Sequence, residues 1–163
     1  MKYDISALGN ALVDTQYKVG YEFLESIGLE ADSMTLASAE EQAPIIKKLI
    51  DMGSESVSDC GGSATNSLIA ASNYGSKCHH VCRVSDDADG KKYLESLRSA
   101  GVDHIGVSSK KSDMPTGKCL ILVTPDAKRT MSSKLGVSAF LGKSDIRFDV
   151  IDDSKIFYIE GYM

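Results

Sequence analysis

Short apolar runs alternate along the chain with stretches whose apolar residues recur at helical spacing. The runs are typical of buried strands and lie at 3–8, 78–84, 102–107 and 156–159. Helical patterns lie at 21–27, 39–52, 63–73 and 91–100. Strands and helices that alternate in this way predict right-handed crossovers and a parallel sheet, which places the chain in the α/β fold class.

Local signals add further elements to this pattern. Ser38-Ala39-Glu40-Glu41 is a capping box that begins the second helix, and Gly28 ends the first. The turn residues Pro125-Asp126 join two apolar segments and predict a β-hairpin over 118–133. We also expect strands at 11–19, with Asp14 on a wetter face, and at 55–60, and a polar loop with a short helix at 143–153.

Length and charge narrow the classes of function. A chain of 163 residues can bury a full core, and a single domain is the default expectation. A net charge of -5 argues against nucleic acid or an anionic membrane surface as the main partner, because a basic patch normally meets both. The chain contains no run of apolar residues long enough for a signal peptide or a membrane span, so a cytoplasmic location is expected.

The cysteines and histidines are read as core residues. Cys60, Cys78, Cys82 and Cys119 form no C-x-x-C pair and are too few for a disulfide scaffold, which predicts reduced thiols. The segment Cys78-His79-His80-Val81-Cys82 is rich in metal-ligand types. On a strand, however, its side chains alternate between two faces, so we expect no metal site there.

A glycine pair opens directly onto a predicted helix. Gly61 and Gly62 precede the run Ser63-Ala64-Thr65-Asn66, and a backbone without Cβ can approach a ligand closely. The first N–H groups of a helix lack intrahelical partners, so hydroxyls or anions bind there. Asn66, one turn further on, would point toward the same place and bind a polyol. The alternative, that the glycines form only a turn and Asn66 is a capping or solvent residue, stays open.

A second candidate follows the first strand. Gly9-Asn10-Ala11-Leu12-Val13-Asp14 places a carboxylate just past a strand end, which is where ligands bind in open α/β sheets. Together with the glycine pair, this segment resembles the two N-terminal substrate motifs of the ribokinase-like (PfkB) family of carbohydrate and nucleoside kinases. The resemblance continues in the family's order through 86–90, 101–103, 116–119, 126–130 and 158–162. The long connection between Asp14 and Gly61, and Glu160-Gly161-Tyr162, look most like the adenosine kinase branch.

The resemblance implies a three-layer α/β/α fold with a mostly parallel central sheet and a small β-sheet lid. Residues 1–163 would be the N-terminal part of a single kinase domain, with lid strands at about 11–19, 55–60 and 118–133. The substrate would be a sugar or nucleoside, and two copies could pair into a homodimer through the lid. The substrate-binding residues would be Asn10, Asp14, Gly61, Gly62, Asn66 and Glu160, and Arg129 would approach the phosphate as the lid closes.

The family transfers the γ-phosphoryl group of ATP to a hydroxymethyl group, with magnesium bridging the phosphates. It carries its catalytic base in a Gly-Ala-Gly-Asp motif of the C-terminal half, and this sequence contains no such motif. We therefore assign no catalytic residue here and expect the chain alone to be inactive. The alternative function is a non-catalytic polyol-binding or interaction module. A dinucleotide-binding dehydrogenase is disfavoured, because Gly9-Asn10-Ala11 lacks the G-x-G-x-x-G pattern.

Overall fold

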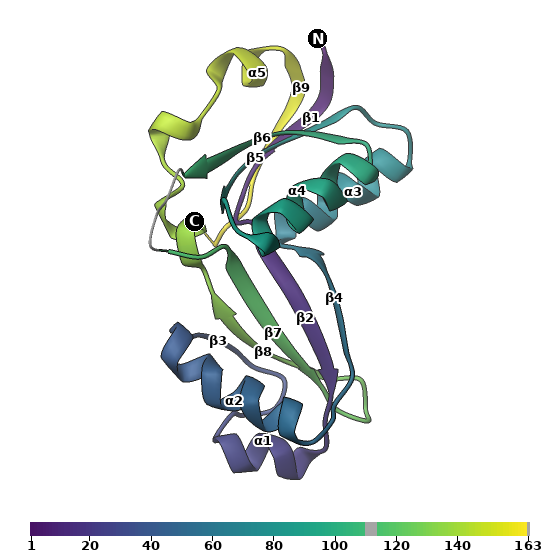
Figure 1. The fold of residues 1–163 in the computed structure, drawn as a ribbon. Helices are drawn as coiled ribbons and strands as arrows, with labels where there is room; N and C mark the ends of the chain where they lie inside the picture. Colours follow the sequence, from purple (N-terminus) through teal and green to yellow (C-terminus); the bar gives the residue numbers. More distant parts are fainter. Residues whose placement is uncertain (110–113, 163) are drawn as a thin grey trace. The chain divides into compact units, whose positions relative to one another are not determined.

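The computed structural model describes residues 1–109 and 114–162. Two compact units make up the chain (Figure 1). The first unit comprises Met1–Val13, Cys60–Gly117 and Leu135–Met163, and the second comprises Asp14–Asp59 and Lys118–Lys134. The chain therefore passes between the units at four points, each within or next to a strand.

A parallel sheet forms the centre of the first unit. Its strand order is β6-β5-β1-β9, where β1 is Tyr3–Leu8, β5 is Cys78–Ser85, β6 is Val102–Ser109 and β9 is Ser154–Ile159. All three neighbouring pairs are parallel, which confirms the sequence prediction. The chain moves outward from β1 to β5 and β6, and then returns to the other side of β1 for β9. The direction of strand order therefore reverses between β1 and β9.

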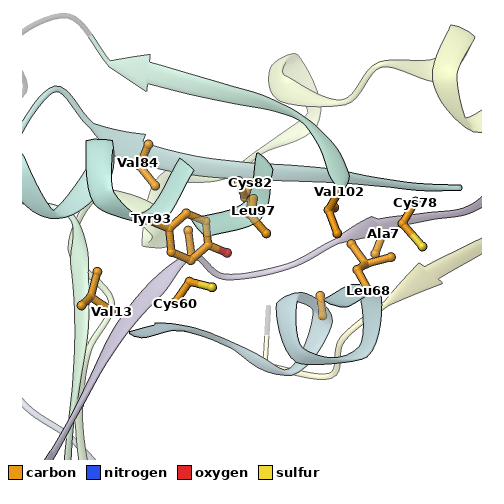
Figure 2. Packing of buried hydrophobic residues seen from close by; sticks show 12 residues of the cluster. Ala7, Val13, Cys60, Leu68, Cys78, Cys82, Val84, Tyr93, Leu97 and Val102 are labelled. Carbon is orange, nitrogen blue, oxygen red and sulfur yellow. The ribbon is translucent and has the colours of Figure 1, made fainter. Parts of the chain in front are cut away.

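Helices α3 (Ser63–Asn73) and α4 (Ala88–Ser99) pack against this sheet (Figure 1). The core between them is formed by small strand residues and larger helix residues, including Ala7, Cys82, Leu68, Tyr93 and Leu97 (Figure 2). The four cysteines are buried free thiols, as expected from the sequence. The described residues contain no helix of the length and apolar character that a membrane span requires.

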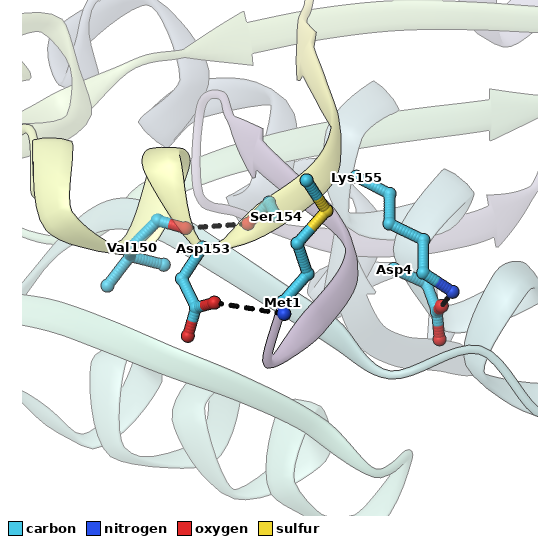
Figure 3. A network of polar contacts seen from close by, with 6 residues as sticks. All are labelled: Met1, Asp4, Val150, Asp153, Ser154 and Lys155. Carbon is cyan, nitrogen blue, oxygen red and sulfur yellow. Dashed lines mark hydrogen bonds and ion pairs between the residues drawn. The ribbon is translucent and has the colours of Figure 1, made fainter.

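The return path from β8 to β9 consists of short elements: the 3-10 helices η1 (Gly136–Phe140) and η2 (Lys143–Asp145), and α5 (Phe148–Asp152). Helix α5 contacts β1 and β9. At its end, the Ser154 hydroxyl donates to the Val150 carbonyl oxygen over 2.6 Å. An ion pair between the Met1 amino group and Asp153 lies beside this bond (Figure 3).

The second sheet has the order β3-β8-β7-β2-β4. Its strands are β2 (Leu12–Lys18), β3 (Met34–Leu36), β4 (Ser56–Gly61), β7 (Gly117–Val123) and β8 (Arg129–Lys134). Helices α1 (Tyr21–Ile27) and α2 (Ala39–Asp51) complete the second unit, whose core includes Tyr17, Phe23, Leu49 and Leu122. The predicted hairpin is the antiparallel pair β7 and β8, and the segments expected to form the lid all lie in this sheet.

Helix ends follow the sequence signals closely. At the start of α2, Glu41 N–H donates to Ser38 Oγ over 3.2 Å and Ser38 N–H donates to the Glu41 carboxylate over 2.7 Å. Gly28 ends α1 with a φ of 69°, a value that glycine adopts without strain. Helix α4 begins earlier than predicted, at Ala88, because the Asp87 side chain accepts a hydrogen bond from Gly90 N–H and caps it.

Candidate functional site

The carboxyl ends of β1 and β9 meet at the reversal of strand order, which is the usual place of a ligand crevice in an open α/β sheet. Gly9 and Asn10 follow β1, and Glu160 follows β9. Helix α3 begins at the same place, because Ala64 N–H in its first turn donates to the Glu160 carboxylate. Four of the six residues predicted to bind substrate therefore gather here: Asn10, Gly61, Gly62 and Glu160.

The Glu160 carboxylate links three segments. Its Oε1 atom accepts hydrogen bonds from the Asn10 backbone N–H over 2.7 Å and from Asn10 Nδ2 over 2.9 Å. Its Oε2 atom accepts from Ala64 N–H over 3.0 Å. The side chain is buried, and its negative charge lies at the positive end of the α3 dipole, which stabilises a carboxylate. Glu160 thus occupies one of the N–H groups that the sequence offered to a ligand.

Both polar atoms of the Asn10 side-chain amide are hydrogen-bonded to the protein. Besides its two bonds to Glu160, Asn10 Nδ2 donates to the Tyr162 carbonyl oxygen over 3.1 Å. Its Oδ1 atom accepts from the Ser138 hydroxyl over 3.0 Å, and the same hydroxyl oxygen accepts from Ala11 N–H over 3.0 Å. Asn10 is only 4% exposed, and each of these side-chain hydrogen bonds is to the protein itself.

Two glycines permit this close packing. Gly62 precedes α3 with a φ of 105°, and a Cβ atom there would overlap the Asn10 carbonyl oxygen. A Cβ atom at Gly9 would lie 2.6 Å from Glu160 Oε2. Any larger residue at Gly62 would therefore meet both backbone strain and a steric clash. The Gly62 backbone therefore packs directly on the segment after β1.

Asn66 lies one turn into α3, where its N–H donates to the Gly62 carbonyl oxygen over 2.9 Å. Its side chain is exposed, and its amide has no hydrogen-bond partner within the described part of the chain. The amide is therefore available as both donor and acceptor on the turn that Gly62 begins.

A buried polar chain that sequence reasoning missed supports the same turn. The Thr65 hydroxyl is hydrogen-bonded to the Tyr93 hydroxyl of α4, which in turn lies 3.4 Å from His80 Nδ1 on β5. All three side chains are buried, and burial raises the pKa of Tyr93 well above its usual value. In the sequence, Tyr93 lies on the apolar face of α4. That pattern predicts core packing of the ring but does not identify a hydrogen-bond partner for its hydroxyl.

Two other segments that carry the family resemblance also come together. Thr116 N–H donates to Asp87 Oδ2 over 2.8 Å, and its hydroxyl donates to Asp87 Oδ1 over 2.7 Å. The Thr116 hydroxyl oxygen also accepts from Ser85 N–H over 3.1 Å. This cluster fixes the start of α4 to the segment that precedes β7.

Asp14 and Arg129 belong to the second unit. Asp14 lies half-buried on β2, and Arg129 is the exposed first residue of β8. Burial raises the pKa of Asp14 to about 6, opposed by the charge of Arg129 and assisted by that of Asp59. Arg129 therefore acts electrostatically on Asp14. Asp14 is thus an acidic group with a cationic neighbour in the second unit, whereas Glu160 belongs to the first unit.

Comparisons with known proteins point to one family. The profile described as pfkB family carbohydrate kinase matches residues 24–163. Adenosine kinase of Saccharomyces cerevisiae is 27% identical over 169 residues, an alignment that covers 99% of this chain and 48% of the yeast protein. Ribokinase of Mus musculus is 28% identical over 100 residues, covering 59% of this chain and 30% of the mouse protein.

Solved structures agree with these relatives. An adenosine kinase from Sinorhizobium meliloti superposes with a TM-score of 0.85 at 31% identity, covering 99% of this chain and 48% of that one. A probable sugar kinase protein from Rhizobium etli CFN 42 gives a TM-score of 0.85 at 30% identity, covering 99% and 47%. The chain thus spans about half the length of the adenosine and sugar kinases that it matches along its whole length.

Proposed function

Because this chain belongs to the pfkB family of carbohydrate kinases, we propose that it supplies the substrate-binding part of an ATP-dependent kinase acting on a hydroxymethyl group of a nucleoside or sugar. The observation that carries the proposal is the assembly of Asn10, Gly62 and Glu160 at the reversal of strand order. A ligand crevice is expected at that place on physical grounds alone. The adenosine kinases among the similar proteins make a nucleoside the first substrate to test.

Each residue has a role that follows from its chemistry. The Asp14 carboxylate offers two acceptor oxygens to neighbouring hydroxyls of the substrate, and Asn66 offers an exposed amide. Gly61 and Gly62 let the substrate approach the backbone at the start of α3. The buried Glu160 chiefly holds that backbone in place, and its Oε2 atom, which accepts one hydrogen bond, keeps a lone pair for a substrate hydroxyl. Arg129, the exposed first residue of β8, is the proposed contact for phosphate oxygens.

Apart from the proposed Arg129 contact to phosphate, ATP and magnesium are assigned to no residue of this chain. Within the described residues, no group of three or more His, Cys, Asp and Glu side chains is arranged to hold a metal ion. The α3 N-terminus, the place where a phosphate would otherwise be attracted, already carries the Glu160 carboxylate. We propose that the rest of the phosphate site, the magnesium site and the catalytic base belong to the part of the kinase that this chain does not include.

A second candidate function is a polyol-binding module that performs no chemistry. The 163-residue sequence contains no Gly-Ala-Gly-Asp motif, which favours this non-catalytic function for these residues alone. Both candidates require the same substrate site, and phosphoryl transfer in a protein extended by its native downstream sequence separates them.

Calorimetric titration with adenosine and with ribose tests the site. We expect saturable binding of at least one ligand, and loss of that binding in Gly62→Val. Gly75→Val is the matched control, because Gly75 also has a positive φ of 91° but a Cβ there meets nothing within 4 Å. If the two variants bind alike, or if neither ligand binds the parent chain, the proposed site is wrong.

We also propose that two copies pair through the second sheet. Its edge strand β3 exposes Met34 and Leu36, which are 45% and 68% accessible. Light scattering should give a dimer for the parent and a monomer for Leu36→Lys. A monomeric parent at every concentration would contradict this pairing.

A further inference from the structure

A pocket of about 640 Å³ lies at the amino ends of β1, β5 and β6, at the opposite end of these strands from Asn10 and Glu160. Parallel pairing places Ser6, His79 and Asp103 side by side on three neighbouring strands. The pocket is bounded by the start of β1, the last turn of α4 and helix α5, all of which belong to the first unit. Its volume is within the range of sites for small organic ligands.

Two rings line the buried part of the pocket. Tyr3 is 6% exposed and His79 is 2% exposed, and their ring centroids lie 5.1 Å apart. The Tyr3 hydroxyl donates to Asp103 over 2.8 Å. His79 Nδ1 lies 3.4 Å from the Ser6 hydroxyl, whereas His79 Nε2 has no hydrogen-bond partner within the described residues. A buried polar atom without a partner is costly, and a ligand in the pocket would remove that cost.

The imidazole of His79 can donate a hydrogen bond to an anion while the ring itself is uncharged. Burial is the main cause that lowers the pKa of His79 to about 4, so the ring is uncharged at neutral pH. When Nδ1 accepts from the Ser6 hydroxyl, the proton resides on Nε2, which then donates.

The charged groups around the opening leave an excess of positive charge. Arg147 is paired with Asp149 over 2.6 Å, and Asp153 is paired with the Met1 amino group over 3.3 Å (Figure 3). The remaining charges are Lys2 and Arg98 against Asp103. Arg98 has no ion-pair partner in the described parts of the chain, and Lys2 Nζ lies 4.8 Å from the centroid of the Tyr3 ring.

From this arrangement we propose that the pocket binds a small oxyanion of the carboxylate or phosphate type, held by the Arg98 guanidinium and by His79 Nε2. The guanidinium matches two oxygens of either group, and the imidazole N–H supplies a third donor. The volume leaves room for an organic group attached to the anion, beside the Tyr3 ring. The site is independent of the proposed kinase function, because it shares no residue with the Asn10 and Glu160 cluster.

The test is an NMR titration of the ¹⁵N-labelled chain at constant ionic strength, with inorganic phosphate in one series and succinate in the other. We expect at least one anion to shift His79 Nε2 saturably while His80 stays unchanged. His80 is an internal control, because its Nε2 is also buried without a partner among the described residues but its side chain is no part of the pocket lining. The anion that binds more tightly identifies the type of ligand.

Arg98→Gln should weaken the binding by about tenfold or more, since a hydrogen bond to a charged group is lost. Lys47→Gln, the same loss of charge on α2 in the second unit, should leave the affinity unchanged. Both side chains are exposed, and Lys2→Gln serves as a second variant at the pocket. Absence of a saturable His79 shift with both anions, equal shifts of His79 and His80, or equal weakening by Arg98→Gln and Lys47→Gln would each overturn the proposal.

Discussion

Replacing Glu160 by glutamine should loosen the start of α3 without removing any volume. The substitution exchanges one carboxylate oxygen for an NH₂ group. Glutamine can therefore continue to accept from Asn10 or from Ala64 N–H, but it cannot serve both sets of donors. At least one buried N–H loses its acceptor and faces another donor.

The magnitude follows from the contacts that are lost. Loss of a hydrogen bond to a charged group costs about 1.5–3 kcal/mol. Loss of the negative charge at the α3 N-terminus adds about 0.3–1 kcal/mol. We therefore expect the free energy of unfolding to fall by about 2–4 kcal/mol in Glu160→Gln.

Hydrogen exchange followed by NMR is the appropriate assay, because it reports on individual amides in a chain with two units. Protection of Asn10 and Ala64 should fall, while that of the second unit stays as in the parent. Glu95→Gln on the exposed face of α4 is the matched control and should change nothing. Unaltered protection at Asn10 and Ala64 in Glu160→Gln would refute the view that this carboxylate organises the site.

Four further predictions concern the substrate site, its pH dependence and its chemistry. Asp14→Ala should weaken binding of adenosine or ribose by about tenfold or more, because a charged acceptor of two hydroxyl bonds is lost; calorimetry showing unchanged affinity would remove Asp14 from the site. Because burial raises the pKa of Asp14 to about 6, the affinity should fall as the pH drops through that value. The pH dependence of stability has the opposite sign. The contribution of Asp14 to the free energy of unfolding is fully present below the unfolded pKa of about 3.9 and is lost as the pH rises through about 6. If the parent instead gained stability relative to Asp14→Asn as the pH rose, this prediction would be contradicted. The 163-residue chain should release no ADP from ATP and magnesium with any sugar or nucleoside in a coupled assay; substrate-dependent turnover would place the base within it.

The sequence predicted helix ends and core strands well, because capping residues, glycines and apolar runs each favour one local structure. The capping box at Ser38 and the glycine at the end of α1 fixed helix ends, and the apolar runs predicted all four strands of the parallel sheet. Strand β3 escaped prediction, because all three of its side chains are exposed and it therefore shows no alternation. It is a strand because its backbone pairs with β8.

The sequence placed Asn10, the glycine pair and Glu160 at neighbouring strand ends, but it did not predict the hydrogen bonds among them. Gly62 was expected to present its backbone to a ligand, and its close approach to the Asn10 carbonyl oxygen was not predicted. Glu160 was expected to contact substrate, and within the described residues its carboxylate accepts three hydrogen bonds from Asn10 and Ala64. The sequence shows that a carboxylate follows a strand. Its hydrogen-bond partners, Asn10 and Ala64, lie far away along the chain, and sequence spacing predicts only contacts between nearby residues. The substrate contacts of both residues stay predictions.

The distance along the chain between the partners of Glu160 also sets an order of events in folding. The Asn10 and Glu160 bonds close a separation of 150 residues, and the Ala64 bond closes one of 96. Local elements such as the β7 and β8 hairpin can form before such contacts, whose loop-closure entropy must be overcome first. During synthesis, the turn after Gly62 would leave the ribosome long before its carboxylate partner exists. The start of α3 should therefore be among the last parts of the first unit to become ordered, and a stalled ribosome exposing residues 1–150 should carry a protein whose Ala64 amide still exchanges freely with water.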